Sequence, residues 1–297
     1  MDHAAPLPPI ERTAAFDRYG ADVPASPVIV SVPHAGRLYE PDMLARMRVG
    51  VDVAQRLEDR GADWLAHDLI ARGASVLIAR TPRAVIDLNR AEREIDPDMV
   101  ADLPRGVRLQ SSAKLRGGLG LIPRRMPGVA ELWRGRLRWD EVEARIDTMH
   151  RPYHAEIARL LHTAREAHGI AVLIDLHSMP PLPSPAFGRR GPQLVLGDRF
   201  GRAATAGLVD VAQEVAMAMG YGVARNHPYA GDHMIARHGR PDLGVHAMQI
   251  EVDRSLYLDA MLDAPGPGMA RTRELVTRIV EAVARATPGV QWALAAE

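Results

Sequence analysis

The 297-residue sequence contains no cysteine, which excludes disulfides, thiolate metal ligands and cysteine nucleophiles. It has a single lysine, Lys114, and no G-x-S-x-G sequence, so covalent catalysis through a Schiff base or a serine elbow is disfavoured. Its 37 basic residues balance 37 acidic ones, and aromatic residues are few. We therefore expect no nucleic-acid partner, because such binding needs positive charge and stacking side chains.

Long apolar segments are also missing. No run of about 18 uncharged apolar residues occurs, and the proline-rich start MDHAAPLPPIERTAAF lacks the apolar region of a signal peptide. We therefore expect a cytoplasmic protein with no membrane partner; nothing in the sequence indicates an oligomeric state. Without thiolates, any bound metal must be held by histidine, aspartate or glutamate.

Apolar runs alternate with helical patterns along the chain. Helices are expected near 52–72, 202–220 and 268–287, and also around 146–164, where Pro152 should kink or interrupt the helix. This alternation predicts an α/β fold with a mixed, mostly parallel sheet, helices on both faces, and sites at the carboxyl ends of strands. The runs typical of strands are residues 27–33, 75–80, 84–89, 170–177, 193–197 and 244–252.

The chain shows no internal repeat and no convincing linker, so residues 1–297 are expected to form one domain. The stretch from about 98 to 138 is rich in glycine, arginine and proline and has poor periodicity. It predicts a long irregular excursion that covers a site.

Polar side chains appear where apolar runs end, although a buried strand normally carries apolar residues on both faces. Two histidines at such positions favour a metal site, since neutral imidazole is a common zinc ligand and a catalytic zinc uses three protein ligands. The third ligand is then expected to be a carboxylate. The strand-end residues are His34, Asp87, Asn89, Arg90, Asp175, His177 and Glu251.

Five segments, in this order along the chain, carry a family resemblance: VPHAG, VIDLNR, LIDLHS, GDHMIARHG and VHAMQIE. Over roughly residues 26 to 260 the chain resembles the N-formylglutamate amidohydrolase family, and DLNR and DLH are similar to strand ends of aspartoacylase and the zinc carboxypeptidases. The resemblance implies a phosphorylase/hydrolase-like, zinc carboxypeptidase-like fold and one Zn²⁺ per chain.

The resemblance implies metal ligands at His34 and His177. In the aspartoacylase and carboxypeptidase relatives a glutamate follows the first histidine by three residues, but this chain has Arg37 there. The family's acid-rich segment matches RLEDRGADWL, so Asp59 is the expected carboxylate ligand and Asp63 the alternative; the two are expected on one helix face, which could equally be a solvated acidic patch. Asp175 is expected to orient a ligand or to pair with an arginine.

Glu251 is the expected general base, because a charged glutamate in an apolar strand is costly unless it is used. His233, in a segment matching the family pattern G-G-H-I-T-R-H, is the candidate donor to the oxyanion. Asn89 and Arg90 are implied to grip a substrate carboxylate. Arg124 and Arg237 are further candidate substrate contacts, although loop and surface arginines often serve only structure.

These features predict a zinc-dependent amidohydrolase acting on a small N-acyl amino acid, most specifically N-formyl-L-glutamate, a substrate that would place it in histidine degradation. A first alternative is a deacylase or carboxypeptidase-like hydrolase for another N-acyl amino acid or short peptide. A second is a non-catalytic carboxylate-binding protein, which would leave His34, His177 and Glu251 without a role.

Overall fold

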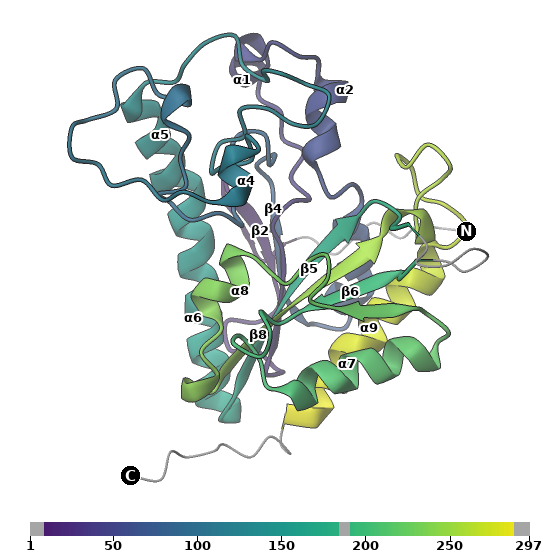
Figure 1. The fold of residues 1–297 in the computed structure, drawn as a ribbon. Helices are drawn as coiled ribbons and strands as arrows, with labels where there is room; N and C mark the ends of the chain where they lie inside the picture. Colours follow the sequence, from purple (N-terminus) through teal and green to yellow (C-terminus); the bar gives the residue numbers. More distant parts are fainter. Residues whose placement is uncertain (1–8, 184–190, 288–297) are drawn as a thin grey trace.

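The computed structural model describes residues 9–183 and 191–287; residues 1–8 of the proline-rich start lie outside them. Their centre is a sheet with the strand order β1-β2-β4-β3-β5-β8-β6-β7 (Figure 1). The four central strands β4, β3, β5 and β8 run parallel, while β2 and β6 pair antiparallel with this group. The strands are β1 (Glu11–Arg12), β2 (Phe16–Tyr19), β3 (Val28–Val32), β4 (Ser75–Ala79), β5 (Ala171–Met179), β6 (Leu194–Gly197), β7 (Val223–Arg225) and β8 (Val245–Asp253).

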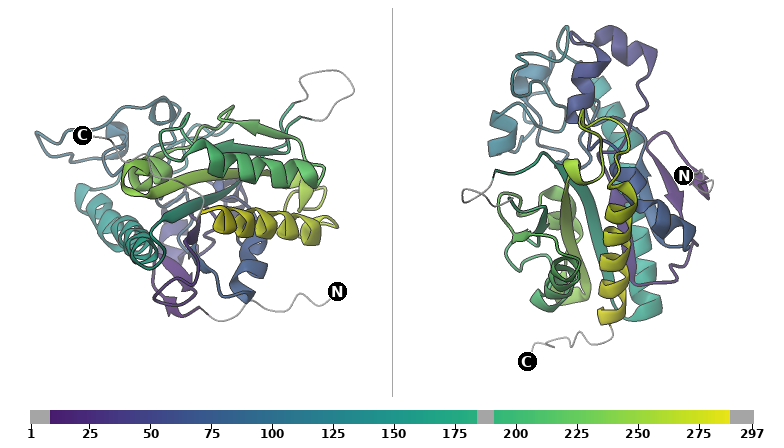
Figure 2. Two further views of the ribbon diagram at one scale, coloured as in Figure 1. Left: turned by 90° about the horizontal axis from the view of Figure 1, so that it is seen from below. Right: turned by 90° about the vertical axis from the view of Figure 1, so that its right-hand side faces the viewer.

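Helices cover both faces of the sheet (Figures 1 and 2). Helices α6 (Arg151–His168) and α8 (His233–His238) pack on one face, and α3 (His67–Ala71), α7 (Ala206–Ala218) and α9 (Met269–Ala286) on the other. The predicted fold class, a mixed and mostly parallel α/β sheet between helices, is confirmed. No helix within the described ranges has the length and apolar character needed to cross a bilayer. The remaining α-helices are α1 (Pro41–Arg46), α2 (Val51–Ala54), α4 (Ala113–Arg116) and α5 (Trp139–Arg145).

Successive residues of the central strands face different cores, as the pleat of a strand requires. Ile29 and Leu173 belong to the core under α6, whereas Val30 and Ile174 belong to the core under α7 and α9. Burial on both faces explains the continuous apolar runs and leaves the strand ends as the places where polar groups can meet.

The prediction of a strand at 84–89 is wrong. This segment forms turns: the Val85 N–H donates to the Pro82 carbonyl, and the Asp87 N–H donates to the Leu121 carbonyl in the irregular region. Its apolar side chains are buried because they pack beneath that region and α6, not because they pair in the sheet. A short buried run does not by itself distinguish these two cases.

The prediction of a continuous helix at 52–72 is also wrong. The chain forms α2, two 3₁₀ turns (Gln55–Leu57 and Ala62–Ala66) and α3, with an interruption at Gly61, whose φ of 69° is left-handed. Asp59 lies in the interruption, so Asp59 and Asp63 do not share a helix face.

The chain passes Pro152 without leaving the helical path. A π-helical turn, Ile146–His150, joins α5 to α6 directly before the proline. Proline lacks an N–H and its ring crowds the carbonyl four residues earlier, and the wider π turn accommodates both. The predicted interruption is thus a local widening, and His150 and His154 are buried where the π turn meets α6.

Candidate active site

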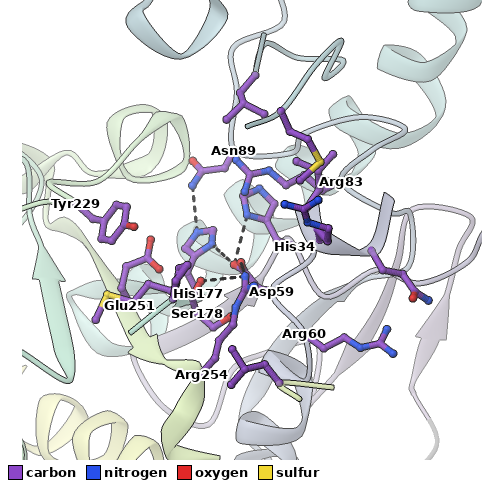
Figure 3. A pocket seen from close by; sticks show the side chains of 18 of the residues that line it. His34, Asp59, Arg60, Arg83, Asn89, His177, Ser178, Tyr229, Glu251 and Arg254 are labelled. Atoms are coloured by element: carbon purple, nitrogen blue, oxygen red, sulfur yellow. Dashed lines mark hydrogen bonds and ion pairs between the residues drawn. The ribbon is translucent and has the colours of Figure 1, made fainter. Parts of the chain in front are cut away.

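Adjacent parallel strands bring three of the strand-end residues to one edge of the sheet. His34 follows β3, His177 lies in β5, and Glu251 lies opposite His177 in the register of β5 and β8. All three line a cavity of about 670 Å³ (Figure 3). The carboxyl edge of a parallel sheet is where α/β enzymes place their sites.

His34, Asp59 and His177 converge on one point, and each is only 3% exposed. The Asp59 Oδ2 lies 2.8 Å from His177 Nδ1 and 3.5 Å from His34 Nδ1. The His34 Nδ1 is buried and has no hydrogen-bond partner among the described residues. Two imidazole nitrogens and one carboxylate oxygen at such spacing fit the three-ligand set of a catalytic zinc.

The outer nitrogen of each imidazole is held by a second carboxylate. His34 Nε2 lies 2.7 Å from Asp87 Oδ1, and His177 Nε2 lies 2.8 Å from Asp175 Oδ2. A carboxylate that accepts the Nε2–H leaves the Nδ1 lone pair directed toward Asp59, as is common around metal ligands. Of the two roles expected for Asp175, this geometry fits the orienting one.

The electrostatics of this group favour positive charge. Burial opposes ionisation of both partners, but the Asp175 and Asp59 carboxylates outweigh it and raise the pKa of His177 well above its usual range. In the same way, burial opposes charge on Asp59, but His177 and His34 together hold the pKa of Asp59 well below its usual range. A metal cation suits such a surplus of buried carboxylates as well as a proton does.

Glu251 faces the same cavity and is 8% exposed. Burial raises the pKa of Glu251 from 4.5 to about 7, and Gln249 Nε2 donates to its Oε1 at 2.7 Å. A carboxyl group with a pKa near 7 can both accept and return a proton at neutral pH. Its place beside His177 therefore suits a general base.

Gly36 lets the turn after β3 pass close to the end of β4. A Cβ at this position would lie 2.0 Å from the Thr81 carbonyl oxygen, so backbone would have to move. We expect Gly36→Ala to displace His34 and to lower both the metal content and the melting temperature. Metal analysis and thermal unfolding would check this; an alanine variant with unchanged values would contradict it. Gly135→Ala is a control, because Gly135 has open space around the new Cβ and no left-handed φ.

Sequence reasoning missed two arginines of the site. Arg254 donates from Nη2 to Asp59 Oδ1 at 3.1 Å and from Nε to Ser178 Oγ at 3.0 Å, so it fixes the far side of the carboxylate. Arg83 donates from Nε to Asp87 Oδ2 at 2.8 Å. The available signals were weak: Arg254 closes the segment MQIEVDR, and Arg83 precedes Asp87 by four residues.

Asn89 and Arg90 line the cavity, as expected, but their polar groups are engaged within the protein. Asn89 Nδ2 donates to Asp175 Oδ2 at 3.2 Å and lies 3.1 Å from His177 Nε2. Arg90 Nη1 binds Asp232 at 3.0 Å, and its Nε donates to the Leu119 carbonyl at 3.2 Å.

Four other candidates are not among the residues that line the cavity. Arg124 is ion-paired with Asp96 and Glu131 and lines a different pocket. Asp63 pairs with Arg37, the residue at which the motif departs from its relatives. The remaining two, Arg237 and His233, lie on α8, where His233 belongs to a second group of histidines.

Comparison with known proteins shows the family of the chain. A family model described as N-formylglutamate amidohydrolase matches residues 26–258. An N-formylglutamate deformylase of Pseudomonas putida is 32% identical over 243 residues, which is 78% of this chain and 82% of the relative. A crystal structure of N-formylglutamate amidohydrolase from Ralstonia eutropha JMP134 has a TM-score of 0.82 at 31% identity, covering 93% of this chain and 98% of that one. A gene product of Agrobacterium tumefaciens shares the fold (TM-score 0.63, 20% identity, 91% of this chain and 95% of that one).

The fold and these matches define a hydrolase that acts on linear amides. More specifically, the chain belongs to the N-formylglutamate amidohydrolase family. The family resemblance carried by the five sequence segments is confirmed.

Proposed function

We propose that this protein hydrolyses N-formyl-L-glutamate to formate and L-glutamate with the help of one zinc ion. The observation that carries the proposal is the convergence of His34, Asp59 and His177 next to a buried Glu251. The names of the similar proteins support the choice of substrate. We further propose that residues 1–297 work as one hydrolytic domain, because the cavity lining extends along the chain from His34 to Asp263.

Zinc held by His34, Asp59 and His177 would supply Lewis acidity, which polarises the amide carbonyl and makes water a stronger acid. Glu251 accepts a proton from the attacking water as the new C–O bond forms. It then donates that proton to the amide nitrogen as the C–N bond breaks. The buried site around Glu251 keeps its pKa close to neutrality for both transfers.

Arg83 is the better candidate to stabilise the oxyanion, since His233 does not line the cavity. The Arg83 Nε is bonded to Asp87, which holds the guanidinium in place. Its two Nη groups have no hydrogen-bond partner within residues 9–183 and 191–287. A fixed guanidinium with free N–H groups can stabilise the negative oxygen of the transition state.

Arg56 and Lys114 are proposed to bind the side-chain carboxylate of the substrate. Both line the cavity, and neither side chain has an ion pair or hydrogen bond in the described part of the chain. The other cavity cations, among them Arg60 and Arg90, are already paired with acids. An unpaired cation at a cavity wall is available to an incoming carboxylate.

We expect Arg56→Gln or Lys114→Gln to reduce the preference for N-formylglutamate over N-formylglutamine by about tenfold, mainly through KM, because a charged hydrogen bond is lost. Steady-state kinetics with both substrates would measure this. Arg116→Gln is the matched control, since Arg116 lies on α4 together with Lys114 but lines the pocket that also contains Arg124. Unchanged selectivity in both variants would remove these residues from the substrate site.

The direct test is formate release from N-formylglutamate by the purified protein before and after removal of metal with a chelator. We expect activity to be lost with the metal and restored by stoichiometric zinc. Activity only on other N-acyl amino acids or peptides would favour the broader deacylase. Substrate binding without hydrolysis, in protein loaded with zinc, would favour a carboxylate-binding protein.

A further inference from the structure

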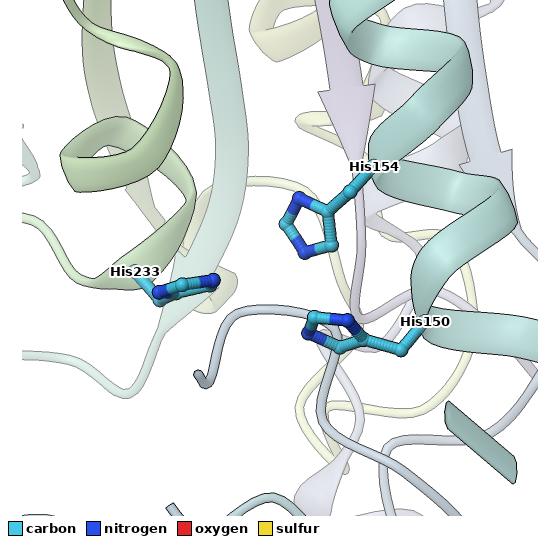
Figure 4. A group of neighbouring side chains, drawn as sticks. All are labelled: His150, His154 and His233. Atoms are coloured by element: carbon cyan, nitrogen blue, oxygen red, sulfur yellow. The ribbon is translucent and has the colours of Figure 1, made fainter. Parts of the chain in front are cut away.

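Four histidines, three of them buried and His233 partly buried, form a second group outside the cavity lining. His150 and His154 lie one helical turn apart where the π turn meets α6, and His233 and His238 lie on α8 (Figure 4 shows the first three). The ring centroids of His150 and His154 are 4.3 Å apart, and those of His154 and His238 are 5.2 Å apart. Nothing in the proposed reaction uses these imidazoles.

The hydrogen bonds of His150 and His154 show which nitrogen of each ring carries the proton. His150 Nε2 lies 2.8 Å from the Arg90 carbonyl oxygen, and His154 Nε2 lies 2.9 Å from the Leu88 carbonyl oxygen. A carbonyl oxygen only accepts, so each Nε2 carries the proton. Burial lowers the pKa of both histidines, which keeps each ring neutral.

The two carbonyls flank Asn89, which touches the proposed metal site. Asn89 Nδ2 contacts Asp175 Oδ2 and His177 Nε2, while Asn89 Oδ1 accepts the Met234 N–H at 2.7 Å. The backbone on either side of Asn89 is thus bonded to the π turn and to α6, and its side chain is bonded to α8 and to β5. These bonds join two helices to the outer side of His177.

We propose that His150 and His154 are positioning residues that hold the 88–90 backbone, and through Asn89 the Asp175–His177 pair, in the geometry the hydrolase needs. The inference rests on the proposed function for its kinetic readout. It assigns a role to the buried side of α6 in the amide hydrolysis, at a distance from the reacting atoms. Small displacements of a site can lower rates strongly, since catalysis depends on orientation.

A second metal site is the competing explanation of this group. Nitrogens of His150, His154 and His233 lie within 4.8 Å of one another. His150 Nδ1 and His233 Nε2 have no hydrogen-bond partner in the described part of the chain, but both nitrogens of His154 are engaged, Nε2 with the Leu88 carbonyl and Nδ1 with His238 Nε2 at 2.9 Å. A metal bound to all three histidines would therefore have to break one of the bonds of His154.

The test compares three variants of His150. Glutamine places an N–H donor near the position of Nε2, asparagine is polar but too short, and phenylalanine keeps a ring without any donor. His168→Phe is the matched control, because His168 Nε2 makes the same kind of bond to the Pro24 carbonyl, at 2.8 Å, at the far end of α6. The measurements are kcat and KM, metal per chain, melting temperature, and hydrogen exchange of the peptide spanning residues 87–91.

We expect His150→Phe and His150→Asn to lower kcat at least about tenfold with metal content unchanged, and His150→Gln to recover most of it. The 87–91 peptide should exchange faster in the first two variants, and this readout needs no enzymatic activity, so it remains informative if the proposed substrate is wrong. His168→Phe should leave both unchanged. If His150→Phe does not fold, the glutamine and asparagine pair decides.

Three results would overturn the proposal. Equal kcat in the glutamine and asparagine variants would show that the donor at Nε2 is irrelevant. A kcat for His150→Phe equal to that of His168→Phe would reduce the bond to a stability contribution. Two metals per chain in the wild type and one in His150→Phe would make the group a metal site.

Discussion

Replacing Glu251 with glutamine is expected to lower kcat for N-formylglutamate by about a thousandfold, because the amide can neither accept the proton of water nor return it to nitrogen. The substitution keeps the size of the side chain and its contact with Gln249, so metal binding should persist. In the wild type, kcat/KM should rise with pH as Glu251 ionises, and this limb should vanish in the variant. Steady-state kinetics across pH 5 to 8 would measure both.

The same substitution should stabilise the metal-free protein at alkaline pH. Burial raises the pKa of Glu251 from 4.5 to about 7, so the folded state holds its proton more tightly than the unfolded chain does. The stabilisation from that proton is complete below pH 4.5 and is lost as the pH rises through about 7. The shift corresponds to about 3 kcal/mol. Denaturant unfolding of both proteins at pH 4.5 and pH 8 should show Glu251→Gln gaining relative stability at the higher pH.

Glu281→Gln, which changes a glutamate on α9 paired with Arg72, is the control for charge removal and should alter neither kinetics nor this pH dependence. A kcat for Glu251→Gln within a few fold of the wild type would exclude Glu251 as the base. A stability difference independent of pH would show that its pKa in the folded protein is ordinary.

The sequence was informative about the site where polar residues interrupt buried apolar strands. Asp175 and His177 share one face of β5, and the cost of burying them unused made a site the better explanation. Parallel strands then bring His34, His177 and Glu251 to the same edge without further information. The family motifs added the choice of Asp59, which the structure places beside both histidines.

The sequence was uninformative where long side chains or irregular backbone decide the outcome. Arg124 and Lys114 come from the same irregular region, yet Arg124 meets Asp96 and Glu131 while Lys114 faces the cavity. Which acids an arginine meets depends on the path of the loop, and no local pattern encodes that path.

The structure places His233 outside the cavity lining for a related reason. Its motif suggested contact with substrate, but α8 turns it toward α6, where it packs against His150 and His154. The π turn and α6 carry those two histidines at a four-residue spacing, which periodicity alone assigns to an ordinary buried face. Only the fold reveals that their donors meet the backbone around Asn89.

Replacing His177 with alanine is expected to remove the metal and to lower kcat/KM by at least about a hundredfold, because Lewis acidity is lost along with one of three ligands. The wild type should contain about one zinc per chain, and the variant far less. Added zinc should raise the melting temperature of the wild type, since ligand binding stabilises the folded state, and should leave that of the variant unchanged. Elemental analysis and thermal unfolding would measure these effects.

Removal of His177 also leaves the Asp59 and Asp175 carboxylates buried without the imidazole between them, so the variant is expected to lose about 3 kcal/mol of stability. If that loss prevents folding, Asp175→Asn tests the same site with the volume conserved, because it weakens the bonds of this carboxylate to His177 and Asn89 without removing a side chain. His162→Ala, an exposed histidine of α6, is the control for histidine removal. Wild-type metal content in folded His177→Ala would exclude His177 as a ligand and, with it, the proposed placement of the metal between β3 and β5.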